Sequence, residues 1–217
     1  MTPEDRRRFV IEHTTVGSAP LVPEIRLHIG GSSMPLWETA ALADLRPAVP
    51  PPYWAWPWPG GQGLARYLLD HPETVRGLSV VDVGAGGGIV AIAAALAGAV
   101  AVGAIDVEPF AIEACRLNAD LNHARIGLFE TDPIGSDDGW DVVFAGDTWY
   151  EPELGARIAG WLRGLAARGA LVLTGDLGRS HLPSSGLVEL ARYSVPTSLD
   201  LEDTDSKLVR VLRFVAE

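Results

Sequence analysis

Apolar residues along most of this chain follow two patterns in turn, and together these patterns predict strands separated by helices. Runs rich in β-branched residues, such as 78–83 and 140–147, are typical of strands that are buried on both faces of a sheet. Between such runs, apolar residues recur every three or four positions, as in helices that pack one face against a sheet. This order predicts βαβ units, and therefore an α/β fold whose mostly parallel sheet carries helices on both faces.

The predicted elements form a regular series after residue 61. Strands are expected at 78–83, 100–106, 124–130, 140–147, 170–176 and 206–217. Helices are expected at 62–71, 89–98, 108–122 and 151–168. Residues 186–193 fit a helical turn. The last two extended segments have no full helix between them, so we expect them to form an antiparallel pair at one edge of the sheet.

The first 49 residues differ in character from the rest. The alternation of Ile25, Leu27 and Ile29 indicates a strand among several prolines. A segment of this length cannot bury much of a core by itself. We therefore expect residues 1–49 to be an extension that packs on a main domain formed by residues 50–217.

Composition and charge exclude several classes of protein. Hydrophobic residues make up 47% of the 217, and the formal net charge is −11, so the chain can bury a core but repels phosphate backbones. We therefore expect no nucleic-acid partner. No apolar run is long enough to span a bilayer, and the N-terminus lacks a signal-peptide core, so we expect no membrane partner. The single cysteine, Cys115, excludes an internal disulfide and indicates a reducing cytoplasm.

The motif that carries chemistry is VVDVGAGGG, which follows a predicted strand and opens a predicted helix. A dinucleotide-binding loop would place its third glycine at position 89, where this chain has Ile89, so the motif disfavours a nicotinamide oxidoreductase. Asp82 precedes the first glycine by two residues and suits a cationic ligand better than a pyrophosphate. Asp106 closes the next strand, where a carboxylate can accept hydrogen bonds from both ribose hydroxyls. A cationic nucleoside without phosphates describes S-adenosylmethionine.

Residues 52–150 resemble the seven-β-strand class of S-adenosylmethionine methyltransferases. Within that class, the chain is similar to the electron transfer flavoprotein β-subunit lysine methyltransferase family. The resemblance rests on the segments PYWAWPWPGGQGLARYLLDHPETVRG, VVDVGAGGGIVAIAA, AIDVEPFAI, GDTWYE and GDLGR. The chain departs from the family pattern at Pro57, and at Leu177 where a proline is expected. The resemblance implies a class I, Rossmann-like methyltransferase fold with seven strands.

The same resemblance implies the residues of the site. Asp147 would capture and orient a substrate amine, and Tyr150 would line the channel for a lysine side chain. The cofactor S-adenosylmethionine would be held by Trp58, Gly61, Asp82, Gly84, Ala85, Gly86, Gly88, Asp106 and Gly146. The substrate would be a lysine of a protein, and the β subunit of electron transfer flavoprotein is the expected partner.

The aromatic segment PPPYWAWPWPGG at 50–61 is expected to be non-helical, because prolines and glycines interrupt it. Two roles stay open for Trp54 and Trp56, which either plug the core beneath a loop or belong to the cofactor site. The resemblance implies that Trp58 contacts the cofactor, and an indole face does attract a sulfonium. An exposed ligand for a partner's aromatic groove is disfavoured, because it would leave three tryptophans in water.

Two other functions stay open at this point. One is a small-molecule N-methyltransferase of the same fold, and the other is a non-catalytic module that retains a cofactor-binding fold. The sequence D-x-x-Y at 147–150 favours the protein-lysine branch by resemblance. The five histidines lack metal-ligand spacing, and no serine lies on a nucleophile elbow, so we expect neither a metal site nor a hydrolase.

Overall fold

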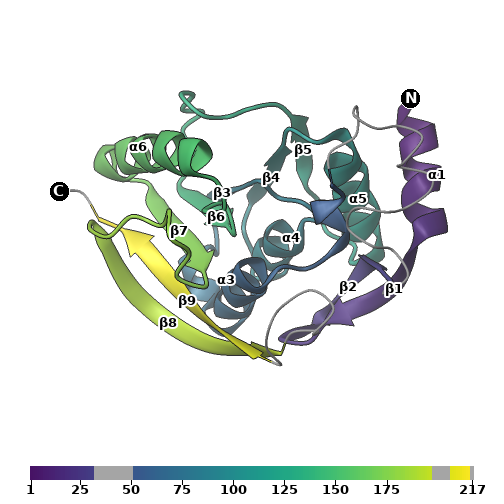
Figure 1. The fold of residues 1–217 in the computed structure, drawn as a ribbon, viewed down its shortest axis with the longest axis horizontal. Coiled ribbons are helices and arrows are strands. Elements are labelled where there is room, and N and C mark those ends of the chain that lie inside the picture. The colour runs from purple at the N-terminus through teal and green to yellow at the C-terminus, as the bar shows by residue number, and fades with distance from the viewer. Residues whose placement is uncertain (32–50, 197–205, 216–217) are drawn as a thin grey trace.

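The computed structural model describes residues 1–31, 51–196 and 206–215, and its main feature is a seven-stranded sheet (Figure 1). Its strands are β3 Ser79–Val83, β4 Ala101–Asp106, β5 Gly127–Glu130, β6 Val142–Gly146, β7 Leu171–Asp176, β8 Leu187–Pro196 and β9 Ser206–Phe214. Their order across the sheet is β5-β4-β3-β6-β7-β9-β8. The first five pair in parallel, whereas β9 pairs antiparallel with both β7 and β8. The predicted parallel sheet with an antiparallel edge pair is confirmed.

Helices cover both faces of this sheet (Figure 1). One face carries α3 Pro59–Asp70, α4 Ile89–Leu96 and α5 Pro109–Leu121, and the other carries α6 Pro152–Arg168. Successive side chains of strand β3 pack into the cores on opposite faces of the sheet. Val80 joins the core cluster beneath α3 and α4, while Val81 and Val83 join the cluster beneath α6. Short 3-10 helices, η1 Tyr53–Ala55 and η2 Pro72–Thr74, flank α3.

The described part of the N-terminal segment contains a helix and a separate hairpin. Helix α1 Pro3–His13 leads into strands β1 Thr14–Ala19 and β2 Val22–Gly30, which pair antiparallel as a two-stranded sheet. Helix α1 packs on α5, where the Phe9 and Phe110 rings lie 5.2 Å apart. Strand β2 contains Ile25, Leu27 and Ile29, so the predicted strand is confirmed. The expected domain boundary at residues 49 and 50 lies outside the described residues.

The helical turn expected at 186–193 is wrong, because these residues belong to strand β8. Their apolar residues recur at Leu187 and Leu190, which imitates a helical spacing. The backbone of β9 instead offers a full row of hydrogen-bond partners, and β8 pairs along it with an irregularity between Glu189 and Ala191. Pairing with a neighbouring strand therefore decides this segment against its local pattern.

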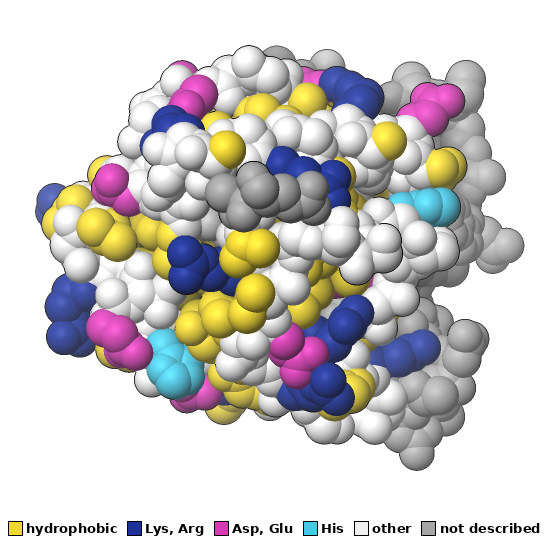
Figure 2. All heavy atoms as spheres, turned by 90° about the vertical axis from the view of Figure 1, so that its left-hand side faces the viewer, with side chains coloured by type: hydrophobic (Ala, Val, Ile, Leu, Met, Phe, Trp, Pro, Cys, Tyr) yellow, Lys and Arg dark blue, Asp and Glu magenta, His cyan; other side chains and the backbone are white. Residues whose placement is uncertain are grey.

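Strand β8 lies at the edge of the sheet, on the side of the molecule that Figure 2 faces. Basic and acidic side chains are interspersed with apolar ones over this face (Figure 2). On β8 itself, Arg192 forms an ion pair with Glu189 at 2.5 Å, beside the exposed Val188 and Leu190. Charged side chains on an edge strand hinder its pairing with other chains.

The expectation that segment 50–61 contains no helix is wrong in two places. Residues Tyr53–Ala55 form the 3-10 helix η1, and α3 begins at Pro59. A proline is tolerated at the first position of a helix, because its missing N–H would have no intrahelical partner there. Residues 59–61 therefore form the first turn of α3, and this turn lies against the carboxyl end of the sheet.

Gly88 provides a test of how tightly this fold packs. It has φ +80°, and an added Cβ would collide with the Cys115 sulfur on α5. Gly77 has nearly the same φ, +77°, but open space around it. We expect Gly77→Ala to cost about 1 kcal/mol for the backbone strain alone. Gly88→Ala should cost about 2–4 kcal/mol, because overpacking adds to that strain.

Urea denaturation of both variants measures this difference in the free energy of unfolding. Equal losses in the two variants would contradict the close packing of the glycine loop on α5.

Candidate functional site

A pocket opens at the carboxyl ends of β3 and β6, where parallel sheets usually bind ligands. Its walls come from the glycine loop, the aromatic segment 53–58, the start of α3, and the N-terminal strand β2. The lining residues are Leu27, His28, Tyr53, Trp54, Trp56, Pro57, Trp58, Gly61, Asp82, Gly84, Ala85, Gly86, Gly87, Ile89, Val90, Asn118, Gly146 and Asp147.

Asp82 lies at the bottom of this pocket and is 2% exposed. The backbone N–H of Ala91 on α4 donates a hydrogen bond to its Oδ2 at 3.2 Å. Burial raises the pKa of this carboxyl to about 8, since a single backbone donor does not replace its lost hydration. The pocket therefore contains a carboxyl group that gains from a cationic neighbour.

Asp106 supports the glycine loop from the next strand. Its Oδ2 accepts a hydrogen bond from the Gly86 N–H, and its Oδ1 accepts one from the Glu108 N–H, both at 2.9 Å. Burial nevertheless raises the pKa of this carboxyl. Asp106 and Gly88 are not among the described residues that line the pocket. Asp106 accepts a hydrogen bond from the loop, and Gly88 lies against Cys115.

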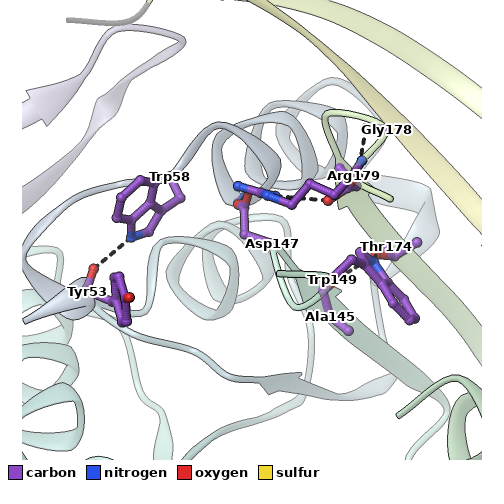
Figure 3. Close-up of polar contacts among 10 residues, drawn as sticks. Tyr53, Trp58, Ala145, Asp147, Trp149, Thr174, Gly178 and Arg179 are labelled. Carbon is purple, nitrogen blue, oxygen red and sulfur yellow. Dashed lines mark hydrogen bonds and ion pairs between the residues drawn. The ribbon is translucent and has the colours of Figure 1, made fainter. Parts of the chain in front are cut away.

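The aromatic segment serves the core and the pocket together. Trp54 and Trp56 are 5% and 8% exposed and belong to a core cluster with Phe110, and both also line the pocket. Trp58 donates its indole N–H to the Tyr53 carbonyl oxygen at 2.8 Å (Figure 3). That bond fixes the orientation of the Trp58 ring at the pocket wall.

Strand β2 completes the wall with Leu27 and His28. Three hydrogen bonds attach it to α5 and its C-cap. The His28 N–H donates to Asn118 Oδ1 at 2.7 Å, the Arg26 N–H donates to Asn122 Oδ1 at 2.9 Å, and the Asn122 side chain donates to the Arg26 carbonyl at 2.6 Å. Burial lowers the pKa of His28, which favours its neutral form. The sequence predicted a strand here but not its place at the pocket, since the contacts join residues about ninety positions apart.

Asp147 follows β6 in an unusual backbone conformation, with φ +57°. Its N–H donates to the Gly175 carbonyl at 3.1 Å, and its Oδ2 accepts from the Gly61 N–H of α3 at 2.7 Å. Its Oδ1 accepts from Arg179 at 2.7 Å (Figure 3). Burial raises the pKa of Asp147, and the Arg179 guanidinium opposes that rise. One contact thus holds the Asp147 backbone at the pocket, and two hold its carboxylate.

Tyr150 lies at the surface beside the pocket, does not line it, and is 51% exposed. Its ring centroid lies 6.0 Å from that of Tyr53, which does line the pocket. Partial burial raises the pKa of the Tyr150 phenol, so its hydroxyl stays neutral at physiological pH.

Trp149, which was not among the predicted site residues, anchors the loop between Asp147 and Tyr150. It is fully buried, and its indole N–H donates to Thr174 Oγ1 at 2.8 Å, which in turn donates to the Ala145 carbonyl at 2.6 Å (Figure 3). Within the segment GDTWYE, Asp147 therefore lies at the pocket, Trp149 in the core and Tyr150 at the surface.

The structure brings most of the predicted site residues together. Seven of the nine predicted cofactor residues line the pocket, as does Asp147: Trp58, Gly61, Asp82, Gly84, Ala85, Gly86 and Gly146. In the described part of the chain, no group of three or more histidine, cysteine, aspartate or glutamate side chains could hold a metal ion. Among the same residues, no helix has both the length and the apolar character needed to cross a bilayer.

Known proteins resemble this chain over most of its length. A family model described as ribosomal protein L11 methyltransferase (PrmA) matches residues 67–146. The electron transfer flavoprotein beta subunit lysine methyltransferase of Xenopus laevis is 40% identical over 213 residues, which cover 92% of this chain and 84% of that protein. The protein of the same name from Homo sapiens is 38% identical over 211 residues, which cover 91% and 78%.

Solved structures show the same fold. Magnesium protoporphyrin IX methyltransferase from Synechocystis PCC 6803, with bound SAM, matches with a TM-score of 0.50 at 18% identity. The match covers 70% of this chain and 76% of that one. The expected class I methyltransferase fold is therefore confirmed.

The buried carboxyl of Asp82 predicts a specific pH dependence of stability. Because its pKa in the folded state is raised to about 8, it favours folding below its ordinary pKa, and this contribution is lost as the pH rises through 8. Asp82→Asn keeps an acceptor for the Ala91 N–H but carries no charge. We expect this variant to be more stable than the parent at pH 8, by about 1–3 kcal/mol.

Asp141→Asn is the matched control near the other end of β3, because hydrogen bonds from Ser79 lower the pKa of Asp141. The ionised form of Asp141 stabilises the folded state, whereas that of Asp82 destabilises it. Asp141→Asn should therefore be less stable than the parent at pH 8. Urea denaturation of the ligand-free protein at pH 5 and pH 8 measures both effects. An Asp82→Asn protein that is less stable than the parent at pH 8 would refute a buried, unpaired carboxyl.

Proposed function

This chain belongs to the electron transfer flavoprotein β-subunit lysine methyltransferase family, and we propose that its pocket holds S-adenosylmethionine while Asp147 and Tyr150 receive a substrate lysine. The protein is an S-adenosylmethionine-dependent protein-lysine methyltransferase. One observation supports the site assignment above all: Asp82, the glycine loop, Trp58 and Asp147 line the same pocket.

The residues present fit this cofactor. Asp82 is a buried carboxyl with one backbone donor, and no lysine or arginine lines the pocket in the described chain, so the site favours a cation. Gly84 and Gly86 adopt φ of +65° and +51°, which lets the backbone turn closely around a ligand. The Trp58 ring lies at the wall, where its face suits a sulfonium or an adenine. Asp106 would hold the loop through Gly86 and accept hydrogen bonds from the ribose hydroxyls.

S-Adenosylmethionine, when bound, supplies an electrophilic methyl group on a positively charged sulfur. The residues of this chain must place a neutral amine next to that methyl group, in line with the bond between the methyl carbon and the sulfur. A free lysine has a pKa of about 10.4, so its amine needs help to lose a proton. Removal of the amine from water and the positive charge of the bound cofactor would both disfavour the charged form.

Asp147 then orients the neutral amine by accepting one of its N–H groups. Its two oxygens each already accept one hydrogen bond from the chain, and a carboxylate has about four lone-pair positions, so acceptor capacity remains. Tyr150 would border the channel through which the lysine side chain enters, opposite Tyr53. Most of the acceleration would come from this positioning rather than from a dedicated base.

The proposed protein substrate is the β subunit of electron transfer flavoprotein, because that subunit appears in the names of the relatives that match over most of this chain. The net charge of −11 favours a basic patch on the partner. The single cysteine is buried and unpaired, which supports a reducing compartment such as the cytoplasm.

Asp147→Asn tests the assignment. Asparagine tolerates the positive φ at this position, so the variant should fold, but it lacks the anionic acceptor. We expect methyl transfer to purified electron transfer flavoprotein β subunit to fall about 100-fold or more. Affinity for S-adenosylmethionine, measured by calorimetry, should change less than about 3-fold, because Asp82 and the glycine loop are intact.

Asp132→Asn is the matched control, because Asp132 forms a similar 2.8 Å pair with Arg157 at the surface. It should transfer methyl groups at the parental rate. Full activity in Asp147→Asn would remove the site assignment, and activity on free amines but on no protein would favour a small-molecule methyltransferase.

A further inference from the structure

We propose that Arg179 is a positioning residue for methyl transfer, which holds the Asp147 carboxylate ionised and oriented while its own charge keeps the incoming lysine amine neutral. This inference rests on the proposed role of Asp147. Arg179 lies in the turn after β7, 32 residues from Asp147, and it does not line the pocket in the described chain. It therefore acts through Asp147 rather than on the substrate.

Asp176, at the end of β7, holds both the backbone and the guanidinium of Arg179. The Asp176 Oδ1 accepts hydrogen bonds from the N–H groups of Gly178 at 2.6 Å and Arg179 at 2.7 Å. Its Oδ2 accepts from the Arg179 guanidinium at 2.9 Å. Asp176 is fully buried, so the turn and the guanidinium have little freedom to move. Figure 3 shows the arginine extending from this turn toward Asp147.

The same guanidinium nitrogen that contacts Asp176 reaches Asp147 at 2.7 Å. The side chains of Arg179 and Asp147 are 23% and 12% exposed, so water screens this pair only weakly. The Gly61 N–H holds the other oxygen of Asp147. Two donors on opposite sides thus fix the plane of the carboxylate, and its remaining lone pairs face a defined direction.

The charges around this group explain why a cation is useful there. The pocket walls contain the carboxyl groups of Asp82 and Asp147 and no lysine or arginine in the described residues. An acidic site of this kind stabilises an ammonium and so opposes the loss of its proton. Arg179 offsets the charge of Asp147 without entering the pocket, and this favours the neutral amine that can attack a methyl group.

The elements packed around Asp147 contribute few other charges. Strand β7 supplies Asp176, the Arg210 side chain on β9 lies near Gly178, and α3 presents backbone at Gly60 and Gly61. Burial and Asp176 raise the pKa of Asp147, while Arg179 lowers it. Without the guanidinium, Asp147 would take up a proton more readily, and a nearby lysine would keep its proton to a higher pH. Both changes suppress activity at low pH and disappear at high pH.

Arg179→Gln and Arg179→Lys are the test variants, with the rate on electron transfer flavoprotein β subunit measured from pH 6 to pH 10. In the glutamine variant, we expect the pH of half-maximal kcat to rise by about one unit, which is about a 10-fold loss at pH 7 that is recovered near pH 9.5. The lysine variant restores a cation and should return the midpoint toward the parental value. KM for S-adenosylmethionine should change less than about 3-fold in both variants.

A second readout does not depend on activity. Carboxyl-carbon NMR of aspartate-labelled, ligand-free protein follows the titration of Asp147, whose signal is identified by its loss in Asp147→Asn. The midpoint should rise in Arg179→Gln and stay near the parental value in Arg179→Lys.

A loss of activity by the same factor at every pH would show a merely structural role and overturn the inference, and so would unchanged activity. If the parent protein methylates no electron transfer flavoprotein β subunit, the proposed substrate fails. The titration of Asp147 then decides the role of Arg179, and a midpoint no higher in Arg179→Gln than in the parent overturns it.

Discussion

Carboxyl groups buried at the carboxyl ends of three neighbouring strands constrain the rest of this structure. Asp82 lies one residue before the end of β3, Asp147 directly follows β6, and Asp176 ends β7. All three lie largely out of water. A buried carboxylate is costly unless donors or cations replace its hydration. The glycine loop, the first turn of α3 and the turn after β7 each direct backbone N–H groups at one of these carboxyls or at Asp106 beside them.

The three groups are satisfied to different degrees, and the differences mark their roles. Asp176 accepts two backbone hydrogen bonds and an arginine, which is a complete structural arrangement. Asp147 accepts one backbone hydrogen bond and shares that arginine. Asp82 has a single backbone donor. Asp82 and Asp147, which line the pocket, therefore have fewer donors than Asp176, and a cationic cofactor and an amine would supply what the chain does not.

The sequence predicted the sheet well, because β3, β4, β6 and β7 are continuous apolar runs with few alternatives. It gave no sign of α1, whose only buried residue is Val10, so no apolar stripe marks the helix. It predicted a helical turn where β8 lies, because the β8 conformation is set by pairing with strand β9. Within the site, the glycine motif located the pocket, but spacing alone could not show that Asp106 accepts a hydrogen bond from the Gly86 N–H or that Gly88 lies against Cys115. The pairing of Arg179 with Asp147 depends on a turn geometry that no motif encodes.

The attachment of β2 to α5 has a consequence for how the molecule is made. The pocket wall of Leu27 and His28 is synthesised first, yet its anchor Asn118 follows 90 residues later. Contacts between residues so far apart in sequence form late, because closing the long loop between them costs conformational entropy before the contacts can stabilise it. The α/β core can therefore assemble around β3 and α4 before β2 docks on α5, and that docking would add the wall of Leu27 and His28 to the pocket.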